Sequence, residues 1–302
     1  MRKFTFISLI SLLSIQFYSN AQDADTAWKS KYDASLGLSQ TTFTNWSSGG
    51  ENAFAMNANL TIFKNYAKDN LTWGNYLGLA YGLSYMQETD PQWRKIDDKI
   101  NLVSKAGLHA WKKWYYSGLF EFRSQFDKGY NYPHPDYISK FMAPGYFQLS
   151  IGMNYKPVDY FALFLSPIGA RLTVVNDPFL TNTLDDKGNL IGAFGVKGDN
   201  TTLWQIGASL NMIFKKDIMK NVNLMSKLDL FSDYTHNPQN IIVGWENNIL
   251  MKVNKYISLS LATRVGYVDN LNYTDREGIT HGPRTQFKET FTIGFAYSLA
   301  HN

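Results

Sequence analysis

The last regular stretch of the chain alternates between two kinds of side chain. Residues 284–299 read RTQFKETFTIGFAYSL, in which apolar residues occupy the odd positions from 287 onward and polar or small residues the even ones, with Glu289 as the exception. A period of two places the two kinds on opposite faces of a β-strand. One face of the sheet must therefore meet an apolar medium and the other a polar one.

The same alternation recurs along the chain and predicts twelve strands. Their expected ranges are 32–43, 53–63, 71–85, 99–110, 114–126, 145–155, 160–175, 203–214, 222–234, 241–253, 256–267 and 284–299. In the seventh strand the apolar positions change from odd to even at Ser166-Pro167. A β-bulge at this point would account for both the proline and the change of face.

The connections between these strands alternate in length. Short turns such as WKK at 111–113 and KPVD at 156–159 alternate with long polar loops such as 127–144 and 176–202. Short turns at one end, long loops at the other and an even strand number are typical of a bacterial outer-membrane barrel. A soluble sandwich with Greek-key crossings has no reason to keep this order. We predict an all-β, twelve-stranded, antiparallel up-and-down transmembrane barrel, with both termini on the short-turn side.

The amino-terminal segment has the features of a secretory signal peptide. Arg2 and Lys3 precede a mainly apolar run, and the segment ends in SNAQ, which predicts cleavage after Ala21. We expect a signal peptide at 1–21, a periplasmic lead at 22–31 and the barrel at 32–302. The protein would then lie in the outer membrane of a Gram-negative bacterium, with membrane lipid and the barrel-assembly machinery as partners.

Composition narrows the other possibilities. The chain has no cysteine, so it cannot be a disulfide scaffold. The formal net charge of +4 includes Arg2 and Lys3, and what remains is too small to indicate nucleic acid. After the signal segment no stretch approaches the roughly 18 apolar residues of a spanning helix.

Several stretches resemble a known family. LGLSQTTFTNWSSGGENAFAMNANL, SQFDKGYNYP, SPIGARLTVVND and LDLFSDY are similar to an uncharacterised family of outer-membrane proteins common in Bacteroidota, domain of unknown function 3078. The resemblance covers essentially the whole mature chain and implies a barrel in the outer membrane. It implies no activity and transfers no catalytic residue. The ending LAHN departs from the terminal aromatic that usually marks such barrels for assembly.

The polar face of the strands carries the candidate functional residues. An Arg or Lys on the lipid face would cost about 2–4 kcal/mol at mid-depth, so we assign charged strand residues to the lumen and place Glu289 near the outer rim. Hairpin geometry predicts Lys105 opposite Glu121, and Glu246 beside Arg264. The charges either form a constriction that selects solutes or neutralise one another inside a narrow barrel. The lumen-lining candidates are Lys99, Lys105, Glu121, Arg123, Arg171, Lys227, Asp229, Glu246, Arg264 and Lys288.

The longest loop is the candidate plug. Residues 176–202 contain the turn signal DDKGN followed by LIGAFGV, which is apolar for a solvated loop. Packing into the barrel mouth would hide Leu190, Ile191, Phe194 and Val196. The favoured function is therefore a narrow or loop-plugged channel for small solutes, or a structural membrane component.

An enzyme is the alternative. Loop residues Ser47, Ser48, His134 and Asp136 could assemble a hydrolase at the barrel rim, but such sets arise by chance in loops rich in Ser and Asp. The loop histidines of YPHPD, YTHNP and ITHGP could meet around a metal, although solvated loop residues are the simpler interpretation. We therefore expect no catalytic residue, cofactor or metal.

Overall fold

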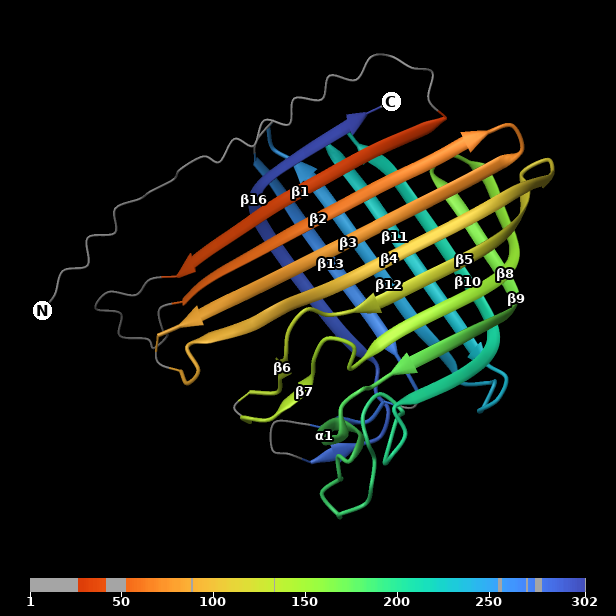
Figure 1. Cartoon of the computed structure of the whole chain (residues 1–302). Helices are drawn as coiled ribbons and strands as arrows, with labels where there is room; N and C mark the ends of the chain where they lie inside the picture. The colour runs from red at the N-terminus through yellow and green to blue at the C-terminus, as the bar shows by residue number, and fades with distance from the viewer. Residues whose placement is uncertain are drawn as a thin grey trace, which may run out of the picture.

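Twelve long antiparallel strands close into a barrel, which confirms the predicted fold class (Figure 1). The computed structural model describes residues 27–41, 53–87, 89–132, 134–254, 257–269, 271–274 and 279–301. The barrel strands are β1 (Trp28–Thr41), β2 (Ala53–Lys68), β3 (Leu71–Met86), β4 (Trp93–Trp111), β5 (Trp114–Ser124), β8 (Gly145–Val158), β9 (Phe161–Val174), β10 (Thr202–Met219), β11 (Val222–Asp233), β12 (Ile241–Lys252), β13 (Ile257–Tyr267) and β16 (Gln286–His301).

Two strands start several residues earlier than the alternation predicts. β1 begins at Trp28, so residues 28–31 of the expected periplasmic lead belong to the barrel. β4 begins at Trp93, within a segment predicted as loop, because it stays paired with β3 up to Tyr85. The rings of Tyr85 and Trp93 lie 5.2 Å apart at this pair. The predicted signal peptide and the loop 42–52 lie outside the described residues.

The last strand closes the barrel, as predicted. β16 pairs with β13 on one side and with β1 on the other, from Ser30 opposite His301 to Gly37 opposite Gly294. A Cβ at Gly294 would lie 2.5 Å from the Leu36 carbonyl oxygen, so glycine permits this close pairing. Closure pairs the edges that an open sheet would expose.

The bulge predicted at Ser166-Pro167 is confirmed. The register of β9 against both neighbours shifts here: Ser166 lies opposite Ser209, whereas Gly169 lies opposite Gly207. The Ser166 hydroxyl lies 2.9 Å from the Ile151 carbonyl oxygen and 2.7 Å from that of Ile168. The one extra residue lets Pro167 sit in the strand without removing a regular ladder hydrogen bond.

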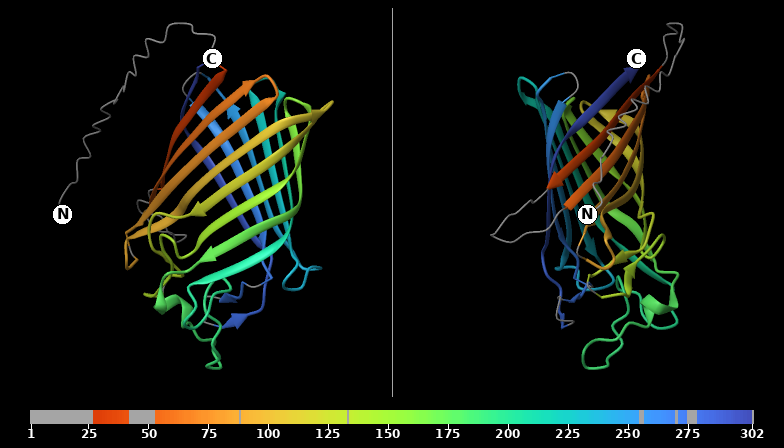
Figure 2. Two further views of the ribbon diagram at one scale, coloured as in Figure 1. Left: turned by 45° about the vertical axis from the view of Figure 1, so that its right-hand side comes forward. Right: turned by 90° about the vertical axis from the view of Figure 1, so that its left-hand side faces the viewer.

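The two ends of the barrel differ as predicted (Figure 2). Short turns join the strands at one end, and Asp69, Lys112 and Asn221 adopt positive φ values of 51, 50 and 64° in them. The other end carries the long loops, which hold the hairpin β6 (Gly129–Tyr130) and β7 (Tyr137–Ser139), helix α1 (Pro178–Thr181), and β14 (Tyr273–Thr274) with β15 (Thr280–His281). Among the described residues, no helix is long and apolar enough to cross a membrane.

The polarity of the barrel is inverted relative to a soluble protein. In β8, Leu149 and Ile151 are 57% and 65% exposed on the outside, while the intervening Gln148 and Ser150 are 7% and 1% exposed on the inside. Exposed aromatic rings flank this apolar wall: Trp73, Trp111 and Tyr116 toward the short turns, Trp93 and Trp204 toward the loops. Such an apolar band with aromatic girdles is the outer surface of a transmembrane barrel.

Candidate constriction and barrel mouth

Polar side chains from the strands are buried in the barrel interior. Glu121, at 3% exposure, is among the most buried side chains, and Asn101, Asn154, Arg171 and Gln205 are buried as well. Of the ten charged residues predicted to line the lumen, Glu121 and Arg171 are buried, and each of the other eight contacts another polar side chain. The contacts among them divide into two layers.

The first layer joins opposite walls of the barrel. Lys99 Nζ on β4 lies 2.8 Å from Glu246 Oε2 on β12. These strands are six positions apart in either direction around the closed sheet of twelve, so they face each other across the lumen. Arg264 Nε approaches the same carboxylate at 3.6 Å. At this level a direct ion pair spans the interior.

The second layer is centred on Lys227 of β11. Its Nζ lies 3.3 Å from Glu121 Oε1 and 3.1 Å from Asp229 Oδ2. Arg123 Nε lies 3.7 Å from the same Glu121 oxygen. Because Glu121 lies on β5, four strands from β11, this contact also crosses the lumen. The guanidinium of Arg171 lies 5.0 Å from the Tyr146 ring centroid and adds to the packing of the interior.

One predicted cross-strand pair is confirmed and the other is wrong. Glu246 lies directly opposite Arg264 in the β12–β13 ladder. Lys105 instead lies opposite Leu119, because the turn is centred between Lys112 and Lys113 and the register shifts again between His109 and Trp111. Its Nζ donates to Asn154 Oδ1 at 2.9 Å. Hairpin counting fails where a bulge adds a residue to one strand.

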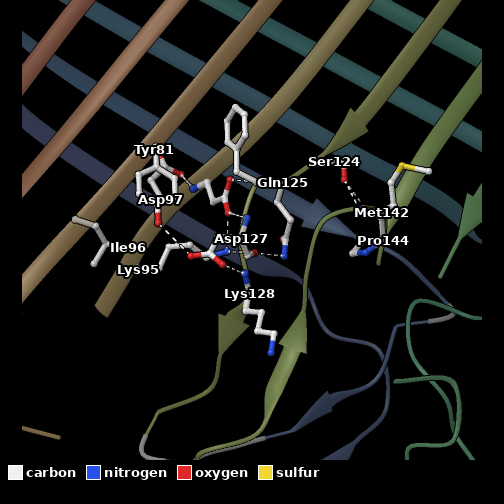
Figure 3. A network of polar contacts seen from close by, with 12 residues as sticks. Tyr81, Lys95, Ile96, Asp97, Ser124, Gln125, Asp127, Lys128, Met142 and Pro144 are labelled. Carbon is white, nitrogen blue, oxygen red and sulfur yellow. Dashed lines mark hydrogen bonds and ion pairs between the residues drawn. The ribbon is translucent and has the colours of Figure 1, made fainter. Parts of the chain in front are cut away.

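A third group of contacts lies at the long-loop mouth, and sequence analysis missed it (Figure 3). Asp98 accepts hydrogen bonds from Lys95 Nζ at 2.7 Å and from the backbone amides of Phe126 and Asp127 at 2.7 and 2.9 Å. Lys95 also donates to the Asp127 carbonyl at 2.7 Å. These contacts fasten the β5–β6 connection to β4. The alternation of polar Lys95, apolar Ile96 and polar Asp97 could have indicated that the strand extends this far. The many polar residues around them instead led to the prediction of a loop.

Lys288 joins the same region from the far side of the mouth. Its Nζ lies 2.6 Å from Asp97 Oδ1, which links β16 to β4. Lys95, Asp97, Lys99, Arg264 and Lys288 all line one cavity of about 240 Å³ at this level.

The expected plug packs on the neighbouring loop rather than into the lumen. Val196, 1% exposed, packs with Ala143, Val175 and Leu180, whereas Leu190 remains 43% exposed. The prediction that Leu190 is hidden in the mouth is therefore wrong. The β5–β8 loop offers an apolar surface, including Ala143 and Tyr137, that does not follow from the sequence pattern.

Asp177 anchors this loop assembly. Its carboxylate accepts hydrogen bonds from Tyr137 Oη at 2.8 Å and the Phe179 amide at 2.9 Å, and pairs with Lys140 Nζ at 2.6 Å. Burial tends to raise the pKa of Asp177, but the bonds from Lys140, Tyr137 and Phe179 outweigh it and hold this pKa below its ordinary value.

The alternative catalytic set falls only partly within the described residues. Ser47 and Ser48 lie outside them, and His134 is exposed at the mouth. His236 Nδ1 contacts Thr235 Oγ1 at 2.9 Å and Asp233 Oδ2 at 3.3 Å, in a local loop turn. Within the described ranges, no group of three or more His, Cys, Asp and Glu residues is arranged to hold a metal ion.

Comparison with known proteins supports part of the resemblance found in the sequence. A family described as protein of unknown function (DUF3078) matches residues 38–130. No curated protein matches the chain. The translocator domain of the autotransporter NalP from Neisseria meningitidis is 12% identical, with 91% of this chain and 89% of that chain covered and a TM-score of 0.37. An outer membrane channel from Pseudomonas putida F1 is 10% identical, covering 91% and 94%, with a TM-score of 0.38. Similarities of this size do not extend to function.

Proposed function

We propose that this protein is a narrow outer-membrane channel that its own lumen side chains hold closed at rest. The apolar outer wall and its aromatic girdles support insertion in a membrane. The signal-like segment at 1–21 supports export to the outer membrane of a Gram-negative bacterium, and the family resemblance supports a source among the Bacteroidota.

The observation that carries the proposal is the ion pair between Lys99 and Glu246. It connects opposite walls directly at 2.8 Å, with the Lys227–Glu121 pair as a second connection. A pair between flexible side chains can separate and admit water and solutes, whereas a packed apolar core cannot do so without leaving a cavity. The constriction therefore supports a gated channel better than a purely structural barrel.

Planar-bilayer recording of the purified mature protein tests the proposal. Truncation of both partners, Lys99→Ala with Glu246→Ala, should give stepwise conductance several times that of the unmodified protein. The matched control is Lys187→Ala with Glu289→Ala, which removes the same two side-chain types from exposed positions on a loop and on the outer face of β16.

The outcome depends on protein that is demonstrably folded, as judged by the heat-sensitive gel mobility of closed barrels. If the folded lumen variant conducts no more than the control, the constriction does not gate a channel. The barrel would then be a structural membrane component.

A further inference from the structure

The cavity at the long-loop mouth has a positive lining. Its basic side chains are Lys95, Lys99, Arg264 and Lys288, and its acidic ones are Asp97 and Asp98. Asp98 is already engaged by Lys95 and two backbone amides. Four cations thus face the two carboxylates of the lining, and Glu246, which contacts Lys99 and Arg264, reduces the excess to one positive charge.

Two cations on this side are direct neighbours. Arg264 and Lys288 are opposite each other in the β13–β16 ladder. Like charges in directly opposite positions destabilise a sheet unless something of opposite charge lies between or beside them. Their side chains remain 50% and 47% exposed in the cavity, so a ligand can reach both of them.

The carboxylates nearby compensate these cations incompletely. Glu246 is shared: it lies 2.8 Å from Lys99 and 3.6 Å from Arg264 Nε, and the second distance exceeds that of a hydrogen bond. Asp97 pairs with Lys288 at 2.6 Å. A guanidinium beside an ammonium, with room in front of them, is the arrangement that binds carboxylate or phosphate oxygens in a fork.

We propose that this cavity binds a small organic anion, bearing a carboxylate or a phosphate, between Arg264 and Lys288. The volume of about 240 Å³ is smaller than that of most drug-sized pockets and limits the ligand to a small solute. Tyr130 and Ile138 line the same cavity and provide contact area for the carbon part of the molecule. The site deepens the proposed function, since it lies next to the Lys99–Glu246 constriction and would concentrate anions at the entrance.

Equilibrium dialysis of the full mature protein in detergent tests the site without any measurement of conductance. The probes are radiolabelled succinate and glucose 1-phosphate, with glucose as the neutral reference. We expect saturable binding of at least one anion, weakening as sodium chloride screens the charges, and no saturable binding of glucose. Which anion binds distinguishes a carboxylate site from a phosphate site.

Substitutions locate the binding within the cavity. Arg264→Gln and Lys288→Gln should each weaken binding by about tenfold or more, the effect of losing one charge-assisted hydrogen bond. Asp97→Asn should strengthen binding, because it removes the carboxylate that competes for Lys288. Lys128→Gln is the matched control, because it removes an exposed positive charge at the same mouth from a residue outside the cavity lining.

The results separate this site from the channel itself. Absence of saturable anion binding, or equal weakening by Lys128→Gln and Arg264→Gln, overturns the site even if the barrel conducts. Saturable binding that depends on Arg264 and Lys288 in a barrel that never conducts retains the site and removes the channel.

Discussion

Glu121 shows how strongly single residues of the interior depend on one another. Its carboxylate is buried at the centre of the barrel and has Lys227 and Arg123 as its cationic neighbours. Removal of one member of a buried ionic group leaves the others desolvated without a counter-charge.

We predict that Glu121→Gln destabilises the barrel by about 3–5 kcal/mol, the usual cost of breaking a buried pair. Urea unfolding in lipid vesicles, followed by tryptophan fluorescence, measures the change. Arg123→Met added to Glu121→Gln should recover part of the loss, because Arg123 loses the carboxylate that it approaches at 3.7 Å, whereas Lys227 keeps Asp229 at 3.1 Å. If the double variant is no more stable than the single one, Arg123 is not the partner that matters.

At the scale of elements, the β5–β8 loop and the 176–202 loop form one unit, because Asp177 bonds to residues of both loops. The carboxylate receives bonds from Tyr137 and Lys140 on one loop and from the Phe179 amide on the other. The length and apolar content of the 176–202 loop mark it as unusual, but its packing surface does not follow from the sequence, since Val196 and Ala143 are distant in the chain.

We predict that this loop assembly loosens in acid. Because the pKa of Asp177 is lower in the folded loops than in the unfolded chain, the stabilisation is present above the unfolded value and is lost as pH falls through the folded value. Hydrogen exchange of the α1 amides should therefore accelerate at acidic pH. In Asp177→Asn the exchange should be faster at neutral pH and nearly independent of pH. Acceleration of the same size in the variant would assign the effect to another group.

At the scale of the whole molecule, the inverted polarity determines where the barrel is stable. Ile151 and Ser150 are adjacent in β8, yet the first side chain is exposed on the outer wall and the second is buried inside. In a bilayer the outer position meets acyl chains.

We predict that Ile151→Arg costs about 2–4 kcal/mol of folding free energy in lipid vesicles, as expected for a lipid-facing charge near mid-depth. Ile151→Leu is the conservative control. The same comparison in detergent micelles should give a smaller difference, because a micelle adapts more readily around a charged side chain. Equal tolerance of arginine and leucine in vesicles would mean that this face does not contact lipid.

Alternation alone was sufficient for the class of fold, because a period of two sorts side chains by the medium that each face meets. It also located the bulge at Ser166-Pro167. The partners of these charges depend on the closed sheet, since Lys99 and Glu246 are 147 residues apart. Only closure of β16 on β1 brings their strands face to face, and only the registers of the turns decide that Lys105 meets Asn154 rather than Glu121.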